Sequence, residues 1–294
     1  MLCYRFGTMT SPNADWTWDK TLFAGAATYY DRGRLPYATG LAEAMQDALG
    51  LDGRGRQLDH GCGPGTVTLR FAHLFAEAVG LDPDPGMLAE AARLAAERRI
   101  DNGSWVESRA EDLAPDFGPF RVVTVAASFH WMEREKVAAT IRNLLEPGGT
   151  LVHVDNHHQD GLGHDASMPH PPVPDDAIRD LRQCYLGLLT RAGQSIRLSS
   201  PDNEAAIFCA AGFEGPQSAW VPDDRVLERT IDDIVAQTFS QSSSAPHLFG
   251  TELTAFEADL RALLLQASPS GRFSVRLRDN ELKIWRPTSR RSGT

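Results

Sequence analysis

Apolar residues in the first half of the chain fall into short continuous runs that alternate with amphipathic stretches. The short runs are predicted to be strands, at 57–59, 77–81, 105–107, 122–127 and 151–154. Helices are predicted at 38–49, at 87–99 and around 137–145, where apolar side chains recur every three or four residues. The run 122–127 is apolar without alternation, which is typical of a parallel strand buried on both faces. This order of elements predicts an α/β fold, a Rossmann-like, doubly wound and mostly parallel seven-stranded sheet.

The pattern changes after the fifth predicted strand. A loop rich in His, Gly and Pro (156–174) comes first, followed by a predicted helix near 178–189 and a second helix that ends at 211–213. A strand at 216–221, helices at 224–239 and 251–266, and apolar alternation over 273–277 and 282–284 are predicted after them. The final alternation predicts an antiparallel edge of the sheet. Ligands of open α/β sheets bind above the carboxyl ends of the strands. We therefore interpret 156–212 and part of 223–250 as a helical cap inserted after the fifth strand, with a purely structural embellishment as the alternative.

These patterns give a predicted domain organisation. It consists of a flexible N-terminal arm (1–18), a Rossmann-like core (19–155), a cap that forms a substrate pocket (156–212), residues that complete the sheet with flanking helices (213–286), and a tail (287–294).

The most informative segment is the loop after the first predicted strand, Leu58-Asp59-His60-Gly61-Cys62-Gly63-Pro64-Gly65-Thr66. A glycine turn that leads into a helix N-terminus lets the backbone lie against a ligand. The dinucleotide fingerprint would need glycine at position 66, where Thr66 stands. Asp59 suits a ligand with a cationic amino group, such as S-adenosylmethionine, or it orients the glycine turn. Asp82 ends the next predicted strand, where an acidic residue accepts hydrogen bonds from a ribose hydroxyl pair.

Four segments in this order resemble the motifs of class I S-adenosylmethionine-dependent methyltransferases, of the small-molecule type that includes ubiquinone-pathway and trans-aconitate enzymes. Besides the glycine loop they are Gly80–Leu88, Ala110–Leu113 and Leu144–Leu151, and the resemblance covers residues 20–155. Arg121 departs from the family, which usually has Asp there, and Leu35 stands where many relatives have proline.

The resemblance implies S-adenosylmethionine as the cofactor and a set of cofactor-binding residues. That set is Tyr30, Arg34, Asp59, Gly61, Cys62, Gly63, Gly65, Asp82, Pro83, Met87, Glu111, Asp112, Leu113, Ala127, Ser128, His130 and Trp131. Within it, Cys62 reads as a small packing residue of the loop. The segment Tyr29–Tyr37 resembles the family's N-terminal segment that closes over the methionine end of the cofactor. In this segment Tyr30 could offer its ring face to the sulfonium, and Arg34 could pair with the carboxylate of the cofactor. The alternative is that the segment is a helix cap with solvated charges.

His130 lies in Ser128-Phe129-His130-Trp131, which resembles the family's Phe-His-Trp signature. An imidazole has an unperturbed pKa of about 6.5, which suits a general base at neutral pH. The alternative is a structural role under the cofactor. His157 and His158 are weaker candidates for the base, in an otherwise polar loop. The histidine-rich tract has no helical spacing typical of a zinc site, and magnesium prefers oxygen ligands, so no metal is predicted.

Charge and composition limit the partners. The chain has 294 residues and a net charge of −10, which opposes binding of nucleic acid over the whole surface. The four cysteines form no C-x-x-C pair, and no leader or membrane-spanning run is found. The sequence therefore predicts a cytoplasmic methyltransferase, monomeric or homodimeric, with a small-molecule acceptor, no nucleic acid and no membrane. An RNA or protein methyltransferase, or a cofactor-binding protein without methyl transfer, remain the alternatives.

Overall fold

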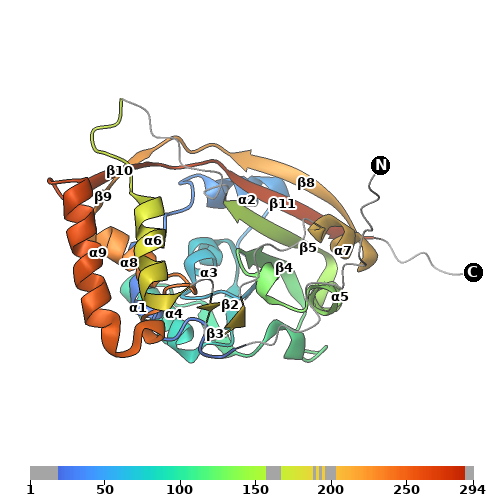
Figure 1. Ribbon diagram of the computed structural model, residues 1–294. Helices are drawn as coiled ribbons and strands as arrows, with labels where there is room; N and C mark the ends of the chain where they lie inside the picture. Colours follow the sequence, from blue (N-terminus) through green and yellow to red (C-terminus); the bar gives the residue numbers. More distant parts are fainter. Residues whose placement is uncertain (1–18, 157–166, 188–189, 192–193, 196–202, 289–294) are drawn as a thin grey trace, which may run out of the picture.

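The computed structural model describes residues 19–156, 167–187, 190–191, 194–195 and 203–288. Its centre is a seven-stranded sheet with strand order β3-β2-β1-β4-β5-β11-β8 (Figure 1). The strands are β1 (Arg56–His60), β2 (Glu77–Asp82), β3 (Gly103–Glu107), β4 (Phe120–Ala126), β5 (Leu145–Asn156), β8 (Phe213–Val221) and β11 (Asn280–Pro287). Strands β1 to β5 pair in parallel, and β11 is antiparallel to both β5 and β8. The predicted mostly parallel sheet with an antiparallel edge is confirmed.

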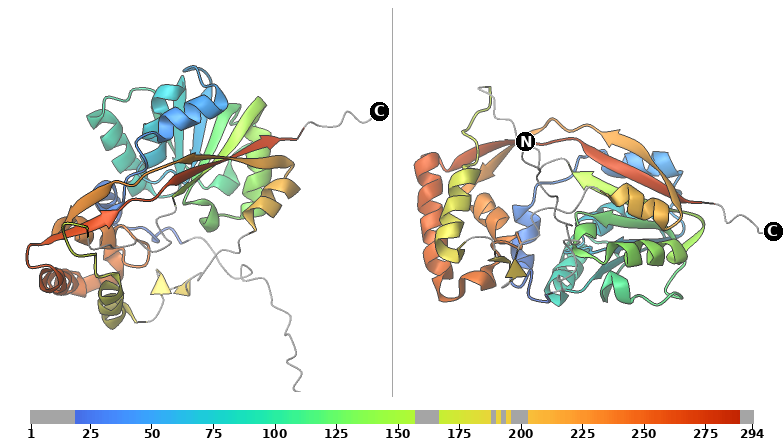
Figure 2. Two further views of the ribbon diagram at one scale, coloured as in Figure 1. Left: turned by 90° about the horizontal axis from the view of Figure 1, so that it is seen from above. Right: turned by 45° about the vertical axis from the view of Figure 1, so that its right-hand side comes forward.

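Helices cover both faces of this sheet and build a separate group beside it (Figures 1 and 2). They are α1 (Ala27–Gly33), α2 (Leu41–Leu49), α3 (Thr66–Phe71), α4 (Pro85–Glu97), α5 (Arg134–Leu144), α6 (Asp175–Leu186), α7 (Glu204–Ala210), α8 (Ile231–Phe239) and α9 (Leu253–Ala267). The start of α4 shows why the chain turns helical there. Asp84 accepts hydrogen bonds from the amides of Gly86 and Met87, and Pro85 occupies the first helical position.

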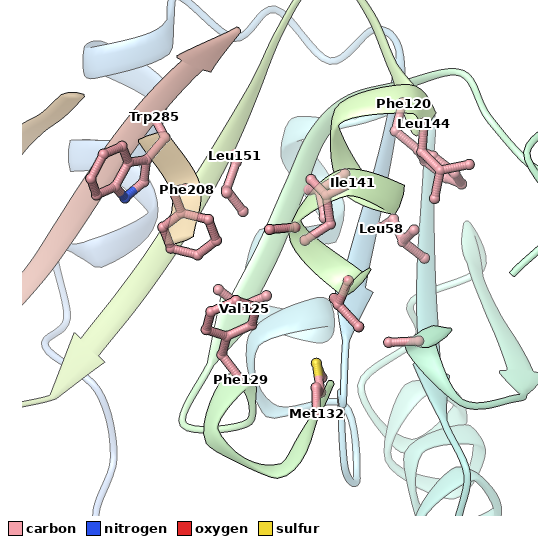
Figure 3. Packing of buried hydrophobic residues seen from close by; sticks show 14 of the residues in the cluster. Leu58, Phe120, Val125, Phe129, Met132, Ile141, Leu144, Leu151, Phe208 and Trp285 are labelled. Atoms are coloured by element: carbon pink, nitrogen blue, oxygen red, sulfur yellow. The ribbon is translucent and has the colours of Figure 1, made fainter. Parts of the chain in front are cut away.

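The two faces of the sheet bury different apolar clusters, because successive strand residues point to opposite sides. Val122 packs with α2 and α3 on one face, and Val123 packs with α5 on the other. Figure 3 shows the cluster on the α5 face, in which Phe208 of α7 lies beside Leu151 and Trp285. The ring centroids of Phe208 and Trp285 are 5.2 Å apart. Helix α7, which lies in the segment 156–212 predicted to be the cap, thus packs its apolar side chains on the sheet against Leu151 of β5 and Trp285 of β11.

A second unit, here called the helical module, contains α6, α8, α9 and a two-stranded antiparallel sheet of β9 (Val226–Thr230) and β10 (Arg272–Arg276). In Figure 1, β9 and β10 continue the ribbon of β8 and β11 toward these helices. The module has its own core, where the rings of Phe249 and Phe256 stack at 4.1 Å.

Two details of the sequence prediction are wrong in this module. The predicted helix 224–239 starts only at residue 231, because Thr230 forms a capping box with Asp233 there. The residues before it form β9. Phe273 and Val275 lie on β10, which pairs with β9 and not with the main sheet.

Candidate functional site

A cavity lies at the carboxyl ends of β1, β2 and β4, the edge at which the glycine loop was predicted to meet a ligand. The predicted site residues that line it are Tyr30, Gly61, Gly63, Asp82, Pro83, Met87, Glu111, Ala127, Ser128 and Trp131. The lining residues that the sequence analysis did not select are Phe23, Leu81, Arg109, Ala110, Ala126 and Met132. This cavity is called the cofactor cavity below.

The glycine loop follows β1 and has a backbone that only glycine adopts without strain. Gly61, Gly63 and Gly65 have φ angles of 64°, 53° and 78°. A Cβ on Gly61 would lie 2.6 Å from the Cβ of Ser128, and a Cβ on Gly65 would lie 2.8 Å from the ring of Trp105. The loop is therefore packed against Ser128, which follows β4, and Trp105 of β3, and Gly61 and Gly63 line the cofactor cavity.

Asp59 is buried beneath the loop and is not among the residues that line the cavity. Its carboxylate accepts hydrogen bonds from the amide of Thr68 at 3.1 Å, the hydroxyl of Thr68 at 2.7 Å and the hydroxyl of Thr124 at 2.8 Å. Burial raises its pKa to about 6, although the hydrogen bonds from Thr68 and Thr124 oppose the rise. This geometry favours the second alternative of the sequence analysis, in which Asp59 orients the glycine turn at the start of α3.

Asp82 ends β2, lines the cavity and contacts the glycine loop. One carboxylate oxygen accepts the amide of Gly63 at 2.9 Å, and the other accepts the amide of Asp84 at 2.9 Å. Burial raises the pKa of Asp82 to about 6, against the two backbone hydrogen bonds. The carboxylate is thus fixed in direction and couples β2 to the glycine loop.

Two buried residues of the segment Ala110–Leu113, Ala110 and Glu111, line the cofactor cavity. Glu111 lines the cavity and accepts the amide of Glu133 at 2.7 Å. Arg109, which was not predicted, also lines the cavity and forms an ion pair with Glu111 at 3.4 Å. Asp112 is exposed and Leu113 packs against the sheet core, so neither lines the cavity. Because Arg109 directly precedes the motif Ala110–Leu113, its position in the sequence could have marked it as a residue of the cavity.

The N-terminal segment closes another side of the cavity. Tyr30 lines it, whereas Arg34 lies behind Tyr30, with its guanidinium carbon 4.7 Å from the ring centroid. Arg34 donates a hydrogen bond to the carbonyl of Ser240 at 2.8 Å, which ties α1 to the end of α8. Phe23 meets Trp131 edge to face, with centroids 6.1 Å apart. No motif in the sequence marks Phe23, because its place depends on how the segment before α1 folds back.

The segment after β4 forms another part of the cavity wall. Ser128 donates a hydrogen bond to the carbonyl of His60 at 2.6 Å, and Ala127 has a φ of 50°, which is unusual for a residue with a Cβ. Trp131 lines the cavity. The ring of His130 lies 4.8 Å from that of Trp131 but is not part of the lining. Cys62 is a buried packing residue whose thiol donates to the carbonyl of Gly63 at 3.3 Å.

None of the other histidines from the sequence analysis is among the described residues that line the cofactor cavity. His157 and His158, the weaker candidates for the base, lie outside the described residues. His153, on β5, forms an ion-pair contact with Glu204 of α7 at 2.9 Å. Among the described residues no group of three or more His, Cys, Asp or Glu side chains could hold a metal ion. The same part of the chain has no helix long and apolar enough to cross a membrane.

Comparison with known proteins finds a methyltransferase family model and relatives that are named as methyltransferases. Residues 58–149 match the family model described as a methyltransferase domain. An uncharacterized methyltransferase of Mycobacterium tuberculosis is 31% identical over 141 residues, which are 48% of this chain and 54% of that protein. The probable S-adenosylmethionine-dependent methyltransferase CRG1 of Saccharomyces cerevisiae is 30% identical over 130 residues, 43% of this chain and 44% of that protein. The chain therefore spans about half the length of the curated relatives it matches.

A solved structure shows the same fold. It is a putative type II methyltransferase from Anaeromyxobacter dehalogenans, with a TM-score of 0.50, 19% sequence identity, and coverage of 86% of this chain and 96% of that chain.

The sheet order and the solved structure define an α/β methyltransferase fold, and the glycine loop lies within the residues that match the methyltransferase domain model. The match of residues 58–149 to the methyltransferase domain model confirms the resemblance found in the sequence.

Proposed function

We propose that this protein transfers a methyl group from S-adenosylmethionine to an oxygen, nitrogen or carbon atom of a small molecule. The observation that carries the proposal is the convergence of the glycine-loop backbone and the Asp82 carboxylate on one cavity. The net charge of −10 supports a small molecule over a nucleic acid. A cytoplasmic location is part of the proposal, since the described cysteines Cys62, Cys184 and Cys209 are free thiols.

The residues of the cavity fit this cofactor. A Cβ at Gly61 would press into Ser128 and force the backbone next to the cavity to shift, so the loop is shaped for close approach. Asp82 would accept the ribose hydroxyls, and the Tyr30 ring and the Trp131 ring would border the ligand from two sides. Glu111 and its ion-pair partner Arg109 lie on the wall that the resemblance assigns to the adenine.

The chemistry divides between the cofactor and the chain. S-adenosylmethionine, when bound, supplies an electrophilic methyl group for in-line displacement. The chain's own residues align the reactants, exclude water and accept a proton from the acceptor where the reaction needs it. We propose that the helical module is the cap that excludes water. His130, next to the cavity wall at Trp131, is the proposed base or the residue that supports that wall.

One experiment separates the small-molecule function from its alternatives. The protein is incubated with S-adenosylmethionine carrying a labelled methyl group and with a small-molecule extract, RNA or protein in separate reactions. We expect label in the low-molecular-mass fraction. Label in RNA or protein would favour the macromolecular alternative, and no transfer at all despite cofactor binding would favour a protein that only binds the cofactor.

Replacing His130 with alanine tests its role. If His130 is the base, turnover should fall by roughly 100-fold or more while cofactor affinity changes little, because a general base contributes about two to four orders of magnitude. The measurement pairs initial rates with a titration of S-adenosylhomocysteine. Comparable losses in rate and affinity would instead assign His130 to support of the cofactor cavity.

Cofactor affinity should depend on pH through Asp82. Its pKa is raised to about 6, so below that value the free protein carries a neutral carboxyl. Ribose hydroxyls donate more strongly to the ionised form, and binding at low pH must therefore release a proton. Affinity for S-adenosylhomocysteine should fall as pH drops from about 7 to about 5, by at most about tenfold per unit.

The control for this pH dependence is Asp82→Asn, measured by the same titration. It should lower affinity at neutral pH and remove most of the dependence. Asp59 also has a raised pKa of about 6 but lies outside the lining. An unchanged dependence in Asp82→Asn would contradict the assignment to Asp82.

A further inference from the structure

Helix α1 brings Tyr30 to the wall of the cofactor cavity, but it is attached to the helical module. Figure 1 shows α1 beside α8. The two backbones are in close contact, because a Cβ on Gly33 would lie 2.4 Å from the carbonyl oxygen of Ala236. The Nε atom of Arg32 lies 2.7 Å from a carboxylate oxygen of Asp233. Since Asp233 belongs to the capping box of α8, this ion pair joins the last turn of α1 to the first turn of α8.

A buried arginine of the module caps the end of α1. Arg229 lies on β9, and its Nη2 atom donates hydrogen bonds to the carbonyl of Arg32 at 3.1 Å and to that of Gly33 at 2.9 Å. The last carbonyls of a helix have no partner within the helix and carry a partial negative charge, so a guanidinium is well suited to bind them. Arg229 is only 5% exposed, so water competes little for these hydrogen bonds. The module therefore fixes the end of α1.

Arg34, the residue that follows α1, makes the reciprocal contact. Its guanidinium donates a hydrogen bond to the carbonyl of Ser240 at 2.8 Å, at the end of α8. The same guanidinium lies over the ring of Tyr30, with its central carbon 4.7 Å from the ring centroid. A cation over the face of a tyrosine ring is attracted electrostatically to that face. Arg34 therefore links the end of α8 to a residue that lines the cofactor cavity.

The polar contact of α1 with α4 is more exposed. Asp31 forms an ion pair with Arg98 at 2.7 Å, but the two side chains are 48% and 41% exposed. Such ion pairs contribute little, because water screens them. Apolar packing of Tyr30 and Ala27 against Met87 completes this side of α1. The position of the Tyr30 ring thus depends on the helical module as well as on α4.

We propose that Arg34 is a positioning residue, which holds the Tyr30 ring against the bound cofactor and so couples the helical module to cofactor binding. The sequence predicts a direct contact of Arg34 with the cofactor, but Arg34 is not part of the cavity lining, and its guanidinium is engaged by Ser240 and Tyr30. Arg34 acts through Tyr30, and Arg229 holds the end of the helix that precedes it. The inference rests on the proposed function, because it assigns the cofactor to this cavity.

The test is a double-mutant cycle on the full chain. Tyr30→Ala, Arg34→Gln and the double variant are each titrated calorimetrically with S-adenosylhomocysteine. Arg34→Gln should weaken affinity by roughly fivefold in the wild-type background, the effect of losing a cation over an aromatic ring. In the Tyr30→Ala background the same replacement should change affinity by less than about twofold, because Arg34 acts through the missing ring. Equal losses in both backgrounds would overturn the proposal, as would unchanged affinity in Arg34→Gln.

Arg98→Gln is the matched control. It also replaces an arginine that contacts the segment around α1, but it removes only the exposed ion pair with Asp31. Its affinity for S-adenosylhomocysteine should stay within about twofold of the wild type, since exposed ion pairs are weak. A loss as large as that of Arg34→Gln would overturn the proposal, because any loosening of α1 would then have the same effect.

A second variant keeps the cycle decisive if Arg34→Gln fails to fold. Arg34→Lys keeps a positive charge and a donor for the Ser240 carbonyl but loses the planar guanidinium over the ring. We expect a smaller loss of affinity, which is again absent in the Tyr30→Ala background, and equal losses in both backgrounds would contradict the role of Arg34.

Failure of the wild type to bind S-adenosylhomocysteine would count against the proposed function. The same cycle is then measured by chemical denaturation, in which the losses from Arg34→Gln and Tyr30→Ala should be less than additive because the two side chains are in contact. Additive losses would overturn the positioning of Tyr30 by Arg34.

Discussion

Replacing Asp82 with alanine is expected to weaken binding of S-adenosylhomocysteine by roughly 100-fold or more, because hydrogen bonds to a charged group contribute about 1.5–3 kcal/mol each. The carboxylate faces the cofactor cavity, where it is proposed to accept the ribose hydroxyls. It also accepts the amides of Gly63 and Asp84, so the alanine would leave both backbone groups without their acceptor. Calorimetric titration measures the affinity, and thermal unfolding checks that the variant is folded.

A matched control is Asp112→Ala. Asp112 lies in a segment that borders the cavity but is exposed and does not line it. Its replacement should leave affinity within about twofold, since surface substitutions away from such contacts usually change free energies by less than about 0.5 kcal/mol. Unchanged affinity in Asp82→Ala would rule out the placement of the second motif at β2.

Replacing Gly61 with alanine is expected to lower the free energy of unfolding by roughly 2–5 kcal/mol. Two effects contribute to this loss. The residue has a φ of 64°, where a Cβ is strained, and the new Cβ would lie 2.6 Å from the Cβ of Ser128, whose hydroxyl donates a hydrogen bond to the carbonyl of His60. Chemical denaturation measures the change, and cofactor affinity should fall with it because the loop backbone must shift.

Gly53→Ala separates the backbone strain at positive φ from the steric contact of the new Cβ. Gly53 has a φ of 80°, but a Cβ there meets nothing within 4 Å. Its replacement should cost only the backbone strain, about 1–2 kcal/mol. Equal losses in the two variants would show that the contact with Ser128 does not constrain the glycine loop.

The part of the fold that the sequence predicts well is local. The apolar run of β4 predicts a buried strand, and the glycine spacing after β1 predicts a ligand-binding turn, each from only a few consecutive residues. The order of strands and helices then limits the possible topologies. The resemblance also selected Asp82, Glu111 and Trp131, which the structure brings together at one cavity.

The rest depends on contacts between distant segments. Residues 226–230 read locally as the start of a helix, but they pair with β10 more than forty residues later, and only that pairing makes them a strand. Helix α7 lies in the segment predicted to be the cap, and its packing on the sheet through Phe208 and Trp285 has no local sequence signal. Phe23 lines the cavity through tertiary packing. Arg34, although predicted to bind the cofactor, donates a hydrogen bond to the end of α8 and lies against the Tyr30 ring.

The measurement that most directly tests the central claim is a parallel calorimetric titration of the purified protein with S-adenosylmethionine, S-adenosylhomocysteine and NAD. The cofactor cavity, with Asp82 fixed beside a glycine loop that lacks the dinucleotide spacing, predicts micromolar binding of the first two ligands and none of NAD. Binding of neither methionine-derived ligand, after removal of any cofactor that co-purifies, would contradict the account.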